Sequence, residues 1–185
     1  LPDAEAAKAA EDYLDQKIAE CDSAGGVVEC VISGLPVGLG EPVFEKLDAN
    51  LAKAILSIGA VKGFEIGDGF AATKACGSEN NDEFRMDGDK IVKETNHAGG
   101  VLGGISDGSD VVFRAAFKPT PSIAKSQETV TKDGANIDLV IHGRHDPVVV
   151  PRAVVVVESM AAITAMDMLL MSMTSRLDLI QMFFQ

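Results

Sequence analysis

The sequence predicts an α+β fold, a sandwich in which helices are covered on both faces by antiparallel sheets. Two hairpin signals support the sheets: Asp87-Gly88-Asp89 and Asp133-Gly134 each separate two short runs with strand character. The segment from Pro151 to about Arg176 is apolar nearly all round, which predicts a helix buried on both faces. With 185 residues, the chain can form one domain with a hydrophobic core, taken here as residues 1–185.

The other elements follow from local patterns. Good helix formers after Pro2 and Asp3 predict a first helix, which Gly25 and Gly26 end. Alternating or β-branched runs bounded by turn residues predict the strands, and an apolar stripe of Phe44, Leu47, Leu51, Ala54 and Ile55 predicts an amphipathic helix. The expected helices are Pro2 to Cys21, Val43 to Ser57 and the final one; the expected strands are Val27 to Ile32, Val61 to Ile66, Glu83 to Met86, Ile91 to Glu94, Val111 to Phe117, Thr129 to Lys132 and Ile137 to Ile141.

The charge balance excludes some classes of partner. A net charge of −12 repels nucleic acid and anionic lipid, and no basic stripe with interleaved aromatic residues occurs. The three cysteines, Cys21, Cys30 and Cys76, are odd in number and form no CxxC, which argues against a disulfide framework or a zinc knuckle. Reduced thiols in a cytoplasm are therefore expected.

No membrane or export segment is expected. The first residues, LPDAEAAKAAEDYLDQ, lack the basic and apolar regions of a signal peptide. The longest apolar stretch, Met160 to Met173, is too short for a membrane span and carries Asp167. It is better interpreted as a buried helix.

Two loops contain residues suited to binding a ligand. Asn96 to Asp107 holds four glycines, which let a backbone approach a flat ligand or a phosphate closely, although the order is neither GxGxxG nor a Walker A loop. Lys118 to Ile123, KPTPSI, combines a cation with hydroxyl groups on a backbone stiffened by two prolines. For each loop a purely structural turn remains an open alternative.

A third candidate is the turn Gly143 to Pro147, GRHDP. Arg144 can form a fork with a carboxylate or phosphate, and Asp146 could act as a base. Asp146 and His145 are adjacent, so a dyad between them is not expected. A solvated turn with an Arg–Asp pair is the alternative. The three histidines, His97 included, form no HxH, HxxxH or HExxH, so no metal site is expected.

Taken together and in this order, the segments resemble chorismate synthase. GRHDPVVVPRAVVVVESMAA, residues 143–162, resembles the family's C-terminal signature, and NHAGGVLGGISDG and FKPTPSI resemble its flavin-site loops. GGVVECVISGLPVGLGEPVFEKLDA and AVKGFEIGDGF are also similar to the family. The resemblance covers about residues 25 to 172, and it is specific because five separated motifs keep their order.

The resemblance implies a flavin-dependent lyase of the shikimate pathway, which leads to the aromatic amino acids. The reaction is an anti-1,4-elimination of phosphate from 5-enolpyruvylshikimate 3-phosphate that gives chorismate and requires reduced FMN without net redox change. The implied fold is a β-α-β sandwich of antiparallel sheets around central helices, usually in a homotetramer. Carried over by motif, Asp146 would help flavin N5 take and pass on a proton, and Arg144 would lie at flavin and substrate. The residues that would line FMN are Gly59, Ala60, Gly103, Lys118, Pro119, Thr120, Pro121 and Ser122.

Two departures from the family pattern limit this expectation. Gly59 stands where many members have Asn, so a side-chain hydrogen bond to the flavin would be missing. The family is also about twice as long, and its Gly-Glu-Ser-His segment, a second functional His and several substrate-binding Arg residues have no counterpart here. The 185 residues are therefore expected to form the C-terminal half of such a domain and to be inactive alone. A non-catalytic folded fragment and a stand-alone flavin-binding module remain as alternatives.

Overall fold

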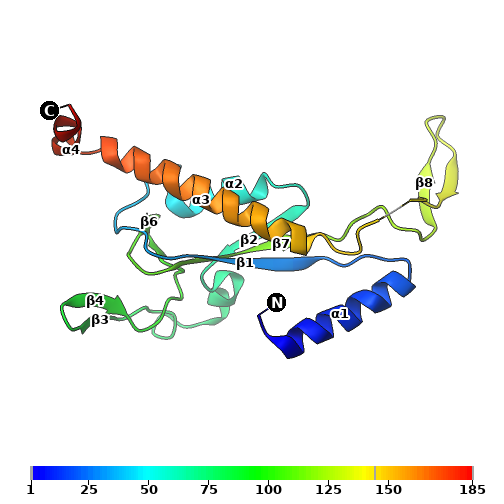
Figure 1. Ribbon diagram of the computed structural model, residues 1–185, viewed down its shortest axis with the longest axis horizontal. Coiled ribbons are helices and arrows are strands. Elements are labelled where there is room, and N and C mark those ends of the chain that lie inside the picture. The colour runs from blue at the N-terminus through cyan, green and yellow to red at the C-terminus, as the bar shows by residue number, and fades with distance from the viewer. Residues whose placement is uncertain (1, 144, 185) are drawn as a thin grey trace.

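The centre of the fold is a three-stranded antiparallel sheet, described by a computed structural model of residues 2–143 and 145–184. Its order is β1 (Gly26–Ile32), β7 (Val111–Phe117), β2 (Val61–Ile66), so the strand that comes last in the sequence lies in the middle (Figure 1). In register, Phe117 pairs with both Gly26 and Val61. The starts of β1 and β2 therefore lie beside the end of β7.

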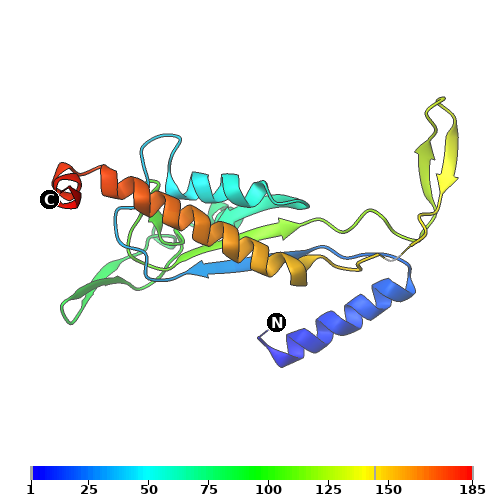
Figure 2. The ribbon, with the colours of Figure 1, turned by 45° about the horizontal axis from the view of Figure 1, so that its top comes forward.

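Helices α2 (Leu47–Leu56) and α3 (Val150–Thr174) lie side by side and pack on this sheet (Figure 2). Successive strand residues point to opposite faces, and in β7 every second residue from Val111 to Phe117 is buried. The core joins those four residues to one stripe of each helix, namely Leu47, Leu51, Ile55, Val157 and Ala161. Helices packed on antiparallel strands confirm the α+β class.

Helix α2 begins four residues later than the apolar stripe predicts. Val43 has a φ of 62°, a left-handed conformation that a β-branched residue rarely adopts and that a helix cannot continue through. Phe44, expected on the buried stripe, is 85% exposed. The first helical amide, that of Leu47, donates to the carbonyl of Gly104 at 2.8 Å, so a tertiary contact fixes the start of the helix.

Helix α3 was expected to be buried on both faces, and this prediction is wrong for the chain as it stands. Its inner face is buried at Ala153, Val157, Ala161, Thr164, Ala165 and Met168. Its outer face is apolar but open, with Val155 60% and Ile163 62% exposed. A helix that is apolar on all sides is predicted to be buried. How much of its surface is buried depends on the elements that pack against it.

By length and composition alone, α3 could also cross a membrane, and no other helix of the described residues passes this test. The sequence predicted this helix from Pro151 to about Arg176, close to the observed 25 residues; the apolar stretch judged too short for a membrane span, Met160 to Met173, is only part of it. Because the inner face of α3 belongs to the core around the sheet, we interpret it as a core helix.

The remaining elements surround this centre. Helix α1 (Ala4–Ala19) buries no side chain and is capped by Asp3, whose carboxylate accepts from the amide of Ala6 at 2.6 Å. The hairpin of β8 (Gln127–Val130) and β9 (Asn136–Leu139) projects from one end of the molecule (Figure 1). The other minor elements are η1 (Gly69–Lys74), β3 (Phe84–Asp87) with β4 (Lys90–Lys93), β5 (Val101–Leu102) with β6 (Ile105–Ser106), and α4 (Leu177–Phe183).

Candidate functional site

Two of the predicted flavin segments meet at one end of the central sheet. The amide of Lys118, just beyond β7, donates to the carbonyl of Ala60, just before β2, at 2.9 Å. Ala60 has a φ of 71°, so the backbone turns sharply there, and next to it the Cα of Gly59 faces open space. The antiparallel register thus places Gly59 and Ala60 beside the KPTPS loop, Lys118 to Ser122.

The Asp146 turn reaches the same end of the sheet through the residues that precede β1. The amide of Ala24 donates to the carbonyl of Pro147 at 2.8 Å, and the hydroxyl of Ser23 donates to the carbonyl of Thr120 at 2.6 Å. A cavity of about 320 Å³ lies between these segments. Its lining includes Cys21, Asp22, Ser23, Ile123, His145 and Asp146.

Asp146 is held by a partner that the sequence did not suggest. Its carboxylate accepts from Arg152 Nη1 at 2.6 Å; the Asp146 side chain is 37% exposed and that of Arg152 73%. The sequence also allowed an alternative in which Asp146 pairs with Arg144 inside the turn, but Arg144 lies outside the described residues. One feature of the sequence could have predicted this pair: Arg152 is the only basic residue in the first two turns of an apolar helix.

The KPTPS loop offers groups that suit an anionic, ring-shaped ligand. Lys118, Pro119 and Pro121 are exposed, whereas Thr120 and Ser122 are half-buried. The hydroxyl oxygen of Thr120 is buried and, within the described part of the chain, has no hydrogen-bond partner. Since buried hydroxyls are normally satisfied, this orphaned group and the exposed Lys118 cation fit a site for FMN.

Gly103 is not brought to this place. It lies in the turn of the β5–β6 hairpin, where Gly103 and Gly104 both have positive φ, of 62° and 94°. This hairpin lies at the start of α2, since Gly104 accepts from the amide of Leu47. The preceding loop flanks the start of β7, where the amide of Val112 donates to Gly99. Because β7 has seven residues, that end of the sheet is roughly 20 Å from Lys118.

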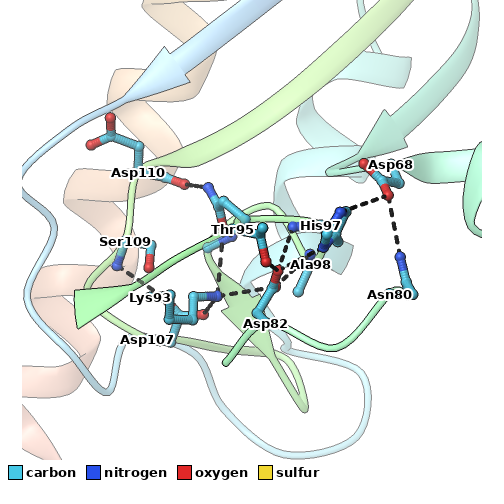
Figure 3. A network of polar contacts seen from close by, with 12 residues as sticks. Asp68, Asn80, Asp82, Lys93, Thr95, His97, Ala98, Asp107, Ser109 and Asp110 are labelled. Atoms are coloured by element: carbon cyan, nitrogen blue, oxygen red, sulfur yellow. Dashed lines mark hydrogen bonds and ion pairs between the residues drawn. The ribbon is translucent and has the colours of Figure 1, made fainter. Parts of the chain in front are cut away.

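A buried charge network holds the glycine loop in place (Figure 3). Lys93 Nζ lies 2.7 Å from Asp107 and 3.3 Å from Asp82, and the three side chains are only 3%, 7% and 4% exposed. Asp82 also accepts from the amides of His97 and Ala98, at 2.7 and 2.9 Å. Sequence reasoning missed this network because its members come from separate segments and no local motif joins them.

Hydrogen bonding keeps both carboxylates of the network ionised. Burial raises the pKa of Asp82, but the amides of Ala98 and His97, the hydroxyl of Thr95 and the Lys93 cation outweigh it and hold that pKa well below its ordinary value. Burial likewise raises the pKa of Asp107, and its hydrogen bonds from Lys93 and Ser109 bring it below its ordinary value. His97 lies 3.0 Å from Asp82 through Nδ1.

Removing the cation of this network should destabilise the chain strongly. We expect Lys93→Met to lower the free energy of unfolding by about 3–5 kcal/mol, because it leaves two buried carboxylates without their counter-ion. Lys90→Met is the matched control, since Lys90 is exposed on the same hairpin and should change stability by less than about 0.5 kcal/mol. Urea unfolding of both variants measures the difference; equal midpoints would contradict the assignment.

The same network should make stability fall in acid. Because the pKa values of Asp82 and Asp107 are lower in the folded chain than in the unfolded chain, their contribution is full above the ordinary value of 3.8. It is lost progressively as the pH falls below that value toward the folded-state pKa values. Urea unfolding between pH 6 and pH 3 should show a smaller loss of stability in Lys93→Met than in the unchanged chain.

The described residues contain no group of three or more His, Cys, Asp or Glu side chains that could hold a metal ion, and the three cysteines are free thiols.

Comparison with known proteins identifies the family. The family profile described as chorismate synthase matches residues 1–170. The chain is 63% identical to chorismate synthase of Lachnoclostridium phytofermentans over 186 aligned positions, and 64% identical to that of Agathobacter rectalis over 185. All of this chain is covered, but only 51% and 50% of those two proteins.

A crystal structure of chorismate synthase superposes with a TM-score of 0.76 at 33% identity, covering 94% of this chain and 45% of that one. The chain thus spans about half the length of the curated relatives that it matches. The match extends over nearly every described element of the fold, and the chain belongs to the chorismate synthase family.

Proposed function

We propose that residues 1–185 form the C-terminal half of a chorismate synthase domain, which converts 5-enolpyruvylshikimate 3-phosphate into chorismate and phosphate. The elimination breaks one C–H and one C–O bond and forms a C=C bond, so atoms balance without an external oxidant or reductant. The complete enzyme would work in the cytoplasm as a homotetramer with reduced FMN.

One observation carries the proposal beyond family membership. Segments far apart in the sequence, at Ala60, Lys118 and Pro147, are joined at one end of the sheet by the hydrogen bonds described above. They are the segments that resemble flavin-contacting motifs of the family. If each segment were only a structural turn, nothing would require the three segments to lie together.

Each residue would have a distinct task at this site. Lys118 would face the negative charge of the FMN phosphate, a local cation in a chain of net charge −12. The hydroxyls of Thr120 and Ser122 would hydrogen-bond the cofactor, and the close backbone at Gly59 and Ala60 would leave room for its ring. Pro119 and Pro121 would keep the loop rigid. Gly103 and Arg144 remain predicted contacts.

When bound, reduced FMN would supply electron density to the electron-poor substrate intermediate and a nitrogen, N5, that can take its proton. Asp146 would hold that proton near N5. It would then release the proton to solvent, because about a third of its side chain is exposed. Arg152 would keep the carboxylate oriented toward the site, because a charged hydrogen bond of 2.6 Å restricts its rotation.

The open face of α3 supports a larger assembly. Its exposed apolar side chains are Val154, Val155, Val156, Ile163, Met166, Leu170, Met171 and Met173. So many exposed apolar side chains on one helix mark a contact site. We propose that the rest of a full-length enzyme covers it, which would complete the sandwich around central helices.

The direct test is a full-length enzyme that contains these residues. Such an enzyme, purified with reduced FMN under anaerobic conditions, should form chorismate from 5-enolpyruvylshikimate 3-phosphate, measured by product absorbance and phosphate release. It should also restore growth without aromatic amino acids to cells that lack chorismate synthase. Phosphate release without chorismate would contradict the proposed reaction.

The 185 residues alone are expected to bind FMN weakly or not at all at micromolar concentrations. Several flavin-facing segments are present, but the chain spans about half the length of its relatives, and its net charge disfavours a phosphate-bearing ligand. Quenching of FMN fluorescence on titration measures this, with the full-length enzyme as the positive control. A submicromolar dissociation constant would favour the stand-alone flavin module instead.

A further inference from the structure

The segment Asp22 to Gly26 lies between the KPTPS loop and the Asp146 turn and contacts both. It joins α1 to β1, and none of its residues was predicted to belong to the site. We refer to it as the joint segment. Its position matters because the two loops come from opposite ends of the 118–147 stretch, with the projecting β8–β9 hairpin between them (Figure 1).

On one side the joint segment fits closely against the KPTPS loop. The hydroxyl of Ser23 donates to the carbonyl of Thr120 at 2.6 Å in a part-buried place. A Cβ at Gly25 would lie 2.5 Å from the carbonyl oxygen of Phe117 and 3.2 Å from Pro119 Cδ, so the backbones could not approach this closely with any larger residue. The Asp22–Lys125 ion pair, at 2.6 Å, is more exposed and contributes less.

On the other side the joint segment holds the end of the Asp146 turn and the residues that follow it. The amide of buried Ala24 donates to Pro147, and Ala24 pairs with Val148 in a parallel bridge. A Cβ at Gly26 would lie 2.9 Å from Val150 Cγ2. Consecutive residues, Ser23 and Ala24, therefore fasten the two loops to one short piece of backbone.

We infer that Ser23 is a positioning residue of the active site, which sets the KPTPS loop at a fixed distance from Asp146. This inference rests on the proposed function. Ser23 is the one side chain of the joint segment with a part-buried hydrogen bond to the KPTPS loop, and its acceptor belongs to Thr120, whose own hydroxyl is the orphaned group of that loop. Loss of the Ser23 hydroxyl frees that carbonyl and lets the loop move relative to Asp146.

The consequence is a defect in geometry rather than in folding. In the full-length enzyme, Ser23→Ala should weaken FMN binding and lower turnover, each by roughly 3- to 10-fold, the size expected from one part-buried hydrogen bond. The melting temperature of the apo-enzyme should change little. Ser23→Thr keeps the hydroxyl and should restore both quantities toward the values of the unchanged enzyme.

The experiment measures FMN affinity, turnover and hydrogen exchange in three variants. Hydrogen exchange should become faster in peptides that cover 22–27 and 120–126 in Ser23→Ala, whether or not FMN is the ligand, which separates this inference from the proposed function. Ser175→Ala is the matched control, because its hydroxyl also donates to a backbone carbonyl, that of Ser172 at 2.7 Å, at the C-terminal end of α3, away from both peptides.

Unchanged exchange in both peptides of Ser23→Ala would overturn the inference even if the enzyme makes chorismate. A Thr variant as impaired as the Ala variant would also overturn it, because the hydroxyl would then not be the group that matters. If the full-length protein neither binds FMN nor makes chorismate, but exchange in both peptides is still faster in Ser23→Ala, the positioning role of Ser23 is supported and the proposed function is refuted.

Discussion

A polypeptide of these 185 residues is expected to form no chorismate from 5-enolpyruvylshikimate 3-phosphate, even with FMN and a strong reductant. No segment of the sequence resembles the family's Gly-Glu-Ser-His motif or supplies the cluster of Arg residues that would hold the substrate's phosphate and carboxylates. Interactions of that kind carry several kcal/mol of transition-state binding, so their absence should remove detectable turnover.

The open face of α3 suggests the control for this experiment. The other half of a full-length enzyme, expressed separately and mixed with the chain, should cover that face and restore part of the activity. Product formation is followed anaerobically against a blank without protein. Turnover by the 185 residues alone, above that blank, would show that the site is complete within them and would contradict the proposal of a half-enzyme.

The second large effect is expected at Asp146 in the full-length enzyme. Asp146→Asn should lower turnover by about 10²- to 10⁴-fold, because the amide keeps the size of the side chain but cannot accept the proton. FMN affinity should change much less, since the KPTPS loop and the backbone near Ala60 would supply most of the contacts. Turnover at saturating reduced FMN, FMN affinity and melting temperature are measured together.

The ion pair with Arg152 provides the control that separates chemistry from structure. If Asp146 serves only to hold Arg152 and the start of α3, then Arg152→Gln should reproduce the loss seen in Asp146→Asn, with a matching fall in stability. If Asp146 handles the proton, Arg152→Gln should be the milder variant. Near-normal turnover in Asp146→Asn would remove this residue from the mechanism.

The local patterns of the sequence determined most of the longer elements, although not the start of α2 or the short elements η1, β5, β6 and α4. The strands Val61–Ile66 and Val111–Phe117 have the predicted bounds, because turn residues limit them and β-strand periodicity is a local property. The Asp-Gly turns predicted both hairpins, and the predicted strand bounds lie within about two residues of the observed ones. Five ordered motifs gave the family, which the comparisons confirm.

Only the tertiary structure decided which of these elements meet. Register places Ala60 beside Lys118, far from Gly103, and no local signal encodes a pairing between residues so distant in sequence. The buried Asp82–Lys93–Asp107 network and the Arg152 partner of Asp146 arise in the same way, through contacts between separate segments. The exposure of α3 has a related cause. An apolar pattern predicts that the helix surface should be buried, but the segments that pack against the helix determine how much of it is buried.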